Sequence, residues 1–132
     1  MRLVDPLLLE FDRECSGTRK CLERLPADKL AWKPHEKSMS LGKLAGHVAT
    51  IPGWIGSALL ADGFDLTSGM AAPPLGTPEE IVAAFDASVK LAKGAMAQLD
   101  DAKAMGEWTL SKGGSALFSM PRLALVRTIL LN

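Results

Sequence analysis

Apolar residues recur along this chain at alternating spacings of three and four residues, the period of a helix that buries one face. The first such stretch follows Asp5 and Pro6, which suit the N-cap and the first helical position. It ends at Pro26, because proline cannot continue a helix. The positions that share its apolar stripe are Val4, Leu8, Phe11, Cys15, Thr18, Leu22 and Leu25. The pattern predicts a first helix from Asp5 to about Leu25.

A second helix is predicted from Ser38 or Ser40, either of which can cap it, to about Ala61. Its apolar stripe consists of Leu41, Leu44, Val48, Ile51, Ile55 and Leu59. Pro52 lies inside this helix and cannot donate a hydrogen bond to the carbonyl four residues earlier. We therefore expect a kink about one turn beyond His47.

The start of a third helix is marked by Thr77-Pro78-Glu79-Glu80, a capping box with proline at the first helical position. Its stripe consists of Ile81, Phe85, Ser88, Ala92, Ala95 and Leu99. Asp100 and Asp101 oppose the dipole at the end of this helix, so its last turn is expected to fray. Further on, Gly113 and Gly114 permit a short hairpin-like turn without requiring one.

Ser119-Met120-Pro121 predicts the start of a fourth helix, whose apolar positions are Leu123, Val126, Ile129 and Leu130. The twelve residues from Pro121 to Asn132 give a helix of about 18 Å, whereas about twenty residues span about 30 Å. Such a helix covers about half of the groove between the other three. We therefore expect either that the chain is cut here or that a second copy covers the rest.

These elements predict an all-α fold, a four-helix bundle with a truncated fourth helix. Residues 1–132 form a single domain, since 132 residues with 48% hydrophobic composition are enough for one core without disulfides. Helices two and three are joined by a long crossing loop from Phe64 to Gly76, which is rich in glycine and proline.

Charge, hydropathy and cysteine content exclude several classes of partner and site for this chain. Fifteen basic and fifteen acidic residues cancel without forming blocks, which argues against nucleic acid as a partner. No apolar run approaches membrane-spanning length, and the first residues lack a signal-peptide pattern, so we expect a soluble, cytoplasmic protein. Cys15 and Cys21 are six residues apart on one predicted helix and cannot bridge within it. Cys15 is most simply a small core residue.

His47 is the histidine that an amphipathic helix would hold in place, just inside the edge of the second stripe and facing the bundle interior. Two interpretations stay open, a hydrogen-bonded core residue and a metal ligand. A catalytic metal needs about three protein ligands, and the carboxylates that could join His47 lack a metal-motif spacing; they are Glu10, Glu14 and Asp86. His35 lies in a loop and is expected to be solvated. The chain shows no catalytic triad order, phosphate-binding glycine loop or zinc-finger spacing.

Several segments, taken in order, resemble the DinB-like family, which includes YfiT-type metal-dependent hydrolases and thiol-dependent transferases. They are Trp32-Lys33-Pro34, the run from Lys37 to Leu44 with His47, Met120-Pro121-Arg122, and Leu130-Leu131-Asn132. The resemblance implies a four-helix bundle with a long loop between helices two and three. It also implies that His47 is one of three histidine ligands of a divalent metal, zinc or nickel.

In that family the other two histidines lie four residues apart on helix four, often directly after an asparagine in the position of Asn132. We therefore expect them within six residues beyond Asn132. The resemblance then implies an enzyme that transfers a small-molecule thiol to an electrophilic substrate, or hydrolyses its substrate. The alternative is a non-catalytic helical bundle that binds a small ligand or acts in stress without metal. A third hypothesis is a homodimer in which a neighbouring chain completes the short fourth helix.

Overall fold

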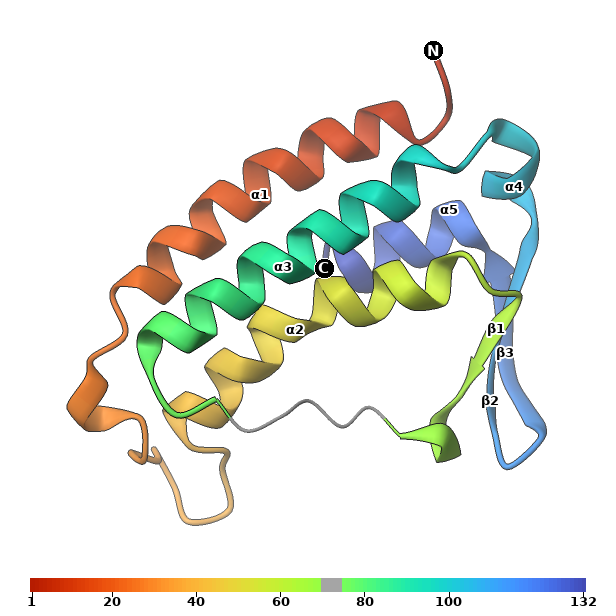
Figure 1. Ribbon diagram of the computed structural model, residues 1–132. Helices are drawn as coiled ribbons and strands as arrows, with labels where there is room; N and C mark the ends of the chain where they lie inside the picture. Colours follow the sequence, from red (N-terminus) through yellow and green to blue (C-terminus); the bar gives the residue numbers. More distant parts are fainter. Residues whose placement is uncertain (70–74) are drawn as a thin grey trace.

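The computed structural model describes residues 1–69 and 75–132. Three long helices lie side by side: α1 (Asp5–Glu23), α2 (Leu41–Leu59) and α3 (Pro78–Ala97) (Figure 1). A 3₁₀ turn, η1 (Ala27–Lys29), lies between α1 and α2. The last helical segment consists of α5 (Arg122–Leu125) and a π-helical continuation, η3 (Val126–Leu130). None of the described helices is long and apolar enough to cross a membrane.

The helix starts follow the caps in the sequence, with one exception. Ser40 caps α2 by accepting a hydrogen bond from the Lys43 amide (3.2 Å), and Thr77 caps α3 in the same way. The N-cap of α1 is Val4, one residue earlier than predicted. The Asp5 carboxylate is not available as the cap, because it accepts hydrogen bonds from the backbone amide and the guanidinium of Arg2.

The prediction of an all-α fold was wrong, because the chain also forms a three-stranded sheet. Its strands are β1 (Gly63–Asp65), β2 (Glu107–Lys112) and β3 (Ser115–Pro121), in that order across the sheet. β1 runs parallel to β2, and β3 runs antiparallel to it. Gly113 and Gly114 both have positive φ, 59° and 83°, the backbone that a two-residue hairpin turn requires. The hairpin turn at Gly113 and Gly114, which the sequence allowed but did not require, is therefore formed.

The sheet also changes the segments on either side of the third helix. Part of the predicted crossing loop is ordered as β1 and a 3₁₀ turn, η2 (Leu66–Ser68), while residues 70–74 of that loop lie outside the described residues. After α3, Asp100 caps a short helix, α4 (Asp101–Met105), by accepting from the Lys103 amide at 2.7 Å. The aspartates predicted to fray α3 thus start the next element.

The fourth helix begins later than predicted. Residues 119–121, taken as its first turn, belong to β3, where Ser119 lies opposite Thr109 and Met120 opposite Trp108. The helical segment starts at Arg122 and extends to Leu130, so it is even shorter than the sequence indicated. Figure 1 shows that it runs behind α2 and that the C-terminal residue lies about halfway along α2 and α3.

The close approach of α2 and α3 determines which face of α2 is buried. A Cβ atom at Gly56 would lie 2.9 Å from the Cα of Ala92, and one at Gly53 would lie 2.9 Å from the Ser88 Oγ. α2 therefore buries its small residues against α3. The predicted stripe is only partly confirmed, since Ile55 and Leu59 are fully buried while Leu44 and Val48 are 49% and 37% exposed. By contrast, every position of the predicted α3 stripe is buried.

The core consists of two clusters that share Cys15 and Val89 at their boundary. The larger cluster joins α3, the end of α2, α5 and the sheet around Trp108, whose indole donates to the Ala58 carbonyl at 3.0 Å. The smaller cluster joins the opposite ends of the three long helices: Leu22, Ala45, Ala49, Ile81 and Phe85. The open part of the helical layer lies beside this smaller cluster.

Candidate functional site

A groove with a volume of about 270 Å³ lies between α1 and α2, and α3 contributes Phe85 to its wall. We call it the α1–α2 groove. Its lining is Phe11, Glu14, Cys15 and Thr18 from α1, Val48, Ile51 and Pro52 from α2, Phe85, and Ile129 to Asn132. Most of the lining side chains are apolar, but polar atoms make up nearly half of the groove surface, with Glu14, Thr18 and Asn132 as the polar side chains.

His47 is exposed and is not one of the residues that line this groove, although it precedes the lining residue Val48 in α2 and lies one helical turn before Ile51. The expectation that it faces the bundle interior was wrong. Among the described residues, the last helical segment lies beside Ile51 and Pro52, and His47 is one turn before Ile51 on α2. No hydrogen bond or ion pair engages the His47 imidazole within residues 1–69 and 75–132. The interpretation of His47 as a hydrogen-bonded core histidine therefore does not fit this geometry.

The three candidate carboxylates do not gather around His47. Glu10 pairs with Arg127 at 3.2 Å, and Asp86 accepts two hydrogen bonds of 2.9 Å from Arg19. These hydrogen bonds engage both carboxylate oxygens of Asp86 and lower its pKa. Glu14 alone lines the groove. Among the described residues, no three histidine, cysteine, aspartate or glutamate side chains lie close enough to hold a metal ion.

Cys15 forms part of the groove wall and is half-buried. Burial, helped by the negative charge of Asp12, raises the pKa of its thiol to about 11. The thiol is therefore protonated at neutral pH and is a poor nucleophile. Cys21 is exposed, and neither cysteine forms a disulfide, as the sequence predicted. The prediction that Cys15 packs as a small core residue is confirmed in part, because it touches both clusters from the groove side.

His35 is exposed in the loop before α2, where its Nδ1 accepts a hydrogen bond from the Lys37 amide at 3.1 Å. The exposure of His35 confirms the prediction that it is solvated. It also makes His35 a useful reference for His47, since the two exposed imidazoles belong to different parts of the molecule.

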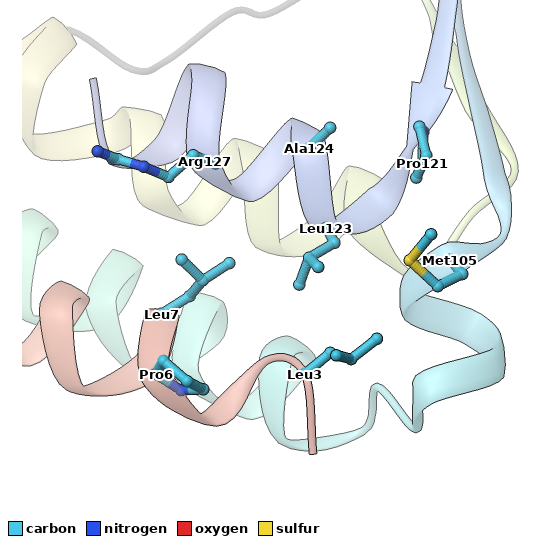
Figure 2. Close-up of a pocket in the computed structure, with 8 residues that line it drawn as sticks. All are labelled: Leu3, Pro6, Leu7, Met105, Pro121, Leu123, Ala124 and Arg127. Carbon is cyan, nitrogen blue, oxygen red and sulfur yellow. The ribbon is translucent and has the colours of Figure 1, made fainter. Parts of the chain in front are cut away.

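A second groove, of about 360 Å³, lies beside the start of α1, and no pattern in the sequence predicted it. We call it the N-terminal groove. It is lined by Leu3, Pro6, Leu7, Met105, Pro121, Leu123, Ala124 and Arg127 (Figure 2). In Figure 2, Leu7 and Leu123 face each other across it, and Met105 and Pro121 close one end. Its residues come from three separate segments of the chain (3–7, 105 and 121–127), so no periodicity along the chain could have revealed it.

Comparison with known proteins identifies the family. A family model described as the DinB superfamily matches residues 10–128. The match includes α1, α2, α3, the sheet and α5, and therefore both walls of the α1–α2 groove together with His47. No curated protein and no solved structure matches the chain.

Proposed function

The chain belongs to the DinB superfamily, and on this basis we propose that it is a metal-dependent enzyme whose site is the α1–α2 groove. The proposed reaction is transfer of a small-molecule thiol to an electrophilic substrate, or hydrolysis. The observation that carries the proposal is the position of His47. Its imidazole is exposed, one helical turn before the groove residue Ile51 on α2, and engages no partner among the described residues, which leaves its nitrogens free to bind.

The described residues do not by themselves fit a zinc or nickel site. They provide one imidazole, and Glu14 is the only one of the three candidate carboxylates that lines the groove. A catalytic metal usually takes three protein ligands and keeps one position open. Two further ligands, proposed as a pair of histidines four residues apart, must therefore come from outside the described residues.

The remaining groove residues support binding of a small molecule. Phe11, Ile51 and Phe85 provide apolar surface, which favours ligands that remove such surface from water. Glu14 and Thr18 offer polar contacts on the α1 side. Because the pKa of Cys15 is raised to about 11, its neutral thiol does not compete with a thiol substrate for the electrophile.

A second candidate function is binding of a small ligand without metal or catalysis. The observation that favours it is the absence, among the described residues, of three metal-ligating side chains near one another. The apolar groove would then act alone. In this case His47 is a surface group that contributes at most one polar contact to the ligand.

Metal titration of the full-length protein separates the two functions. We expect zinc or nickel to bind, and His47→Ala to weaken binding at least about tenfold, because removing one ligand of a small set costs more than 1.4 kcal/mol. His35→Ala removes an exposed imidazole outside the groove and is expected to leave the affinity unchanged. Equal metal affinity of His47→Ala and the parent would contradict the metal-dependent function.

Chelation gives an independent measurement. A metal bound only by the native state raises the melting temperature, so the metal-dependent function predicts a drop in melting temperature when chelator is added. The same chelator should have no effect on His47→Ala. An unchanged melting temperature of the parent, combined with binding of apolar small molecules in the groove, would support the non-catalytic function.

A further inference from the structure

The α1–α2 groove carries negative charge without a compensating positive charge. Among the described residues that line it there is one carboxylate, Glu14, and no lysine, arginine or histidine. Thr18 lies four residues further along α1, so its hydroxyl neighbours Glu14 on the same helix face. An ionised carboxylate accepts hydrogen bonds and donates none. The groove therefore favours a ligand that brings hydrogen-bond donors and positive charge, and it disfavours an anion.

Glu14 differs from the other carboxylates of α1, because no basic side chain pairs with it in the described part of the chain. The other acidic side chains of this helix each form an ion pair: Asp5 with Arg2, Glu10 with Arg127, Asp12 with Lys93 and Glu23 with Arg19. Glu14 is instead exposed at the groove. Its charge is therefore available to a ligand.

The opposite wall of the groove offers a second acceptor, the backbone carbonyl of Val48. Because proline has no amide hydrogen, Pro52 cannot donate the helical hydrogen bond that this carbonyl would otherwise accept. The neighbouring Thr50 hydroxyl does not replace it, since it donates to the Gly46 carbonyl at 2.8 Å. Val48 and Pro52 both line the groove, so the turn that lacks this hydrogen bond is part of its wall. A carbonyl without its helical donor seeks another partner.

The thiol of Cys15, between Glu14 and the buried side of the groove, reports the same negative field. Burial is the largest cause that raises its pKa to about 11, and the charges of Asp12 and Glu14 add to the rise while Lys93 opposes it. Negative charge raises a thiol pKa because it repels the thiolate. Since Lys93 pairs with Asp12, Glu14 is the acid whose charge stays unbalanced beside this thiol.

The rest of the groove suits the apolar body of a small ligand. Phe11, Ile51, Phe85 and Ile129 contribute apolar surface to its lining. The volume of about 270 Å³ lies just below the range of about 300–1,000 Å³ that is usual for drug-sized ligands. The groove thus has room for one ring or a short chain next to the acceptors.

We propose that the α1–α2 groove binds a small primary amine with an apolar body, whose ammonium group contacts the Glu14 carboxylate, the Thr18 hydroxyl and the Val48 carbonyl. An ammonium group has three donors and one positive charge, which match these three acceptors. The inference rests on the proposed function, since it names the substrate class of the same groove. Amine binding itself requires no metal, so the two can be tested separately.

Three probes with similar skeletons test the charge preference: 2-phenylethylamine, the neutral 2-phenylethanol and the anionic 3-phenylpropanoate. Each is titrated into the full-length protein in the presence of chelator, and binding is followed by calorimetry or NMR. We expect the amine to bind at least about fivefold more tightly than either of the other two, because it alone gains charge-assisted hydrogen bonds. Equal or tighter binding of the alcohol or the carboxylate, or no saturable binding of any probe, would overturn the proposal.

Substitution of Glu14 locates the preference. Glu14→Gln should weaken amine binding at least about fivefold and leave binding of the alcohol unchanged, and because Glu14 is exposed the variant loses no core packing. Glu36→Gln is the matched control, since Glu36 is exposed in the loop before α2 and does not line the groove; its amine affinity should equal that of the parent. Equal amine affinity of Glu14→Gln and the parent would contradict the proposal.

Substitution of Pro52 tests the second acceptor. Pro52→Ala supplies the missing amide donor to the Val48 carbonyl and should weaken binding of the amine more than binding of the alcohol. An unchanged ratio of the two affinities would overturn the assignment of this carbonyl. The outcome is separable from the metal-dependent function: a protein that binds zinc through His47 but shows no preference for the amine would keep that function and refute this inference.

Discussion

At the scale of single residues, two side chains hold neighbouring elements together: Arg122 binds the end of α2, and Asp65 binds the turn between β2 and β3. The buried Arg122 donates through Nε to the Leu59 carbonyl (2.9 Å) and through Nη2 to the Ala61 carbonyl (2.8 Å). It thereby satisfies carbonyls at the end of α2, which a helix leaves without internal partners. The Asp65 carboxylate accepts from the amides of Gly113 (3.1 Å) and Gly114 (3.0 Å) and so holds the hairpin turn against β1.

Replacing Arg122 by methionine should destabilise the protein by about 2–3 kcal/mol, because the carbonyls it satisfies lose a charged donor in a buried setting. The measurement is urea unfolding at neutral pH. Arg127→Met is the matched control on the same helical segment, since Arg127 is 56% exposed and makes a surface pair with Glu10. It should cost less than about 1 kcal/mol. An equal decrease in the free energy of unfolding for the two variants would show that the buried Arg122 contacts contribute no more than the exposed Arg127–Glu10 pair.

Asp65 predicts a specific pH dependence. Its hydrogen bonds, first from the Thr67 hydroxyl and then from the Gly114 and Thr67 amides, hold its pKa well below the ordinary value. A lowered native pKa means that its contribution is full above about pH 4, the ordinary carboxyl pKa, and is lost as pH falls below it.

Asp65→Asn should therefore lower the melting temperature at pH 7, with a smaller difference from the parent at the lowest pH where both fold. Asp28→Asn, in the exposed turn η1, is the control and should change the melting temperature little at either pH. A gap between parent and Asp65→Asn that stays constant with pH would contradict this account.

At the scale of elements, the sequence correctly predicted features that depend on residues close together in the chain, namely helix caps and the buried stripe of α3. Ser40 and Thr77 cap α2 and α3 as expected, and the stripe of α3 is the buried one. The stripe of α2 was misjudged because apolar periodicity favours large side chains, whereas the tightest packing of α2 uses Gly53 and Gly56. The sheet was missed because β1 and β2 pair from distant parts of the chain, a contact that no local pattern reports.

The packing of α2 against α3 predicts opposite effects for two glycines. Gly56→Ala should destabilise the protein by about 1–3 kcal/mol, because its Cβ would meet the Ala92 backbone at 2.9 Å. Gly94→Ala, on the exposed side of α3, meets nothing within 4 Å and should stabilise by up to about 1 kcal/mol through helix propensity. Chemical denaturation measures both. A stabilising Gly56→Ala would show that the helices can separate at little cost.

At the scale of the whole molecule, the two hydrophobic core clusters differ in size. The larger one combines α3, α5, the sheet and the end of α2, while the smaller one holds the start of α2 beneath an uncovered face. Membership of the DinB superfamily was predictable from the segments that include His47. The exposure of His47 was not, because it depends on how the neighbouring helices pack against α2, and residue spacing alone does not show this.

This inequality predicts an order of local opening. Amides around Gly46 to Val48 should exchange faster in the native state than those around Ile55 to Leu59, since local opening requires less burial to be lost near the smaller cluster. Hydrogen exchange on the native protein measures this. A single protection level along all of α2 would mean that the helix opens only as one unit.

The close contact of α2 and α3 also determines which wall of the α1–α2 groove can move. Those two helices are joined through backbone contact at Gly56, whereas α1 is held to α3 partly by solvent-exposed ion pairs, Arg19 with Asp86 and Lys93 with Asp12. Dissolved salt weakens such pairs and leaves apolar backbone contact intact. Ionic strength should therefore change the width of the α1–α2 groove by changing how tightly α1 is held to α3. The spacing between α2 and α3 should stay the same.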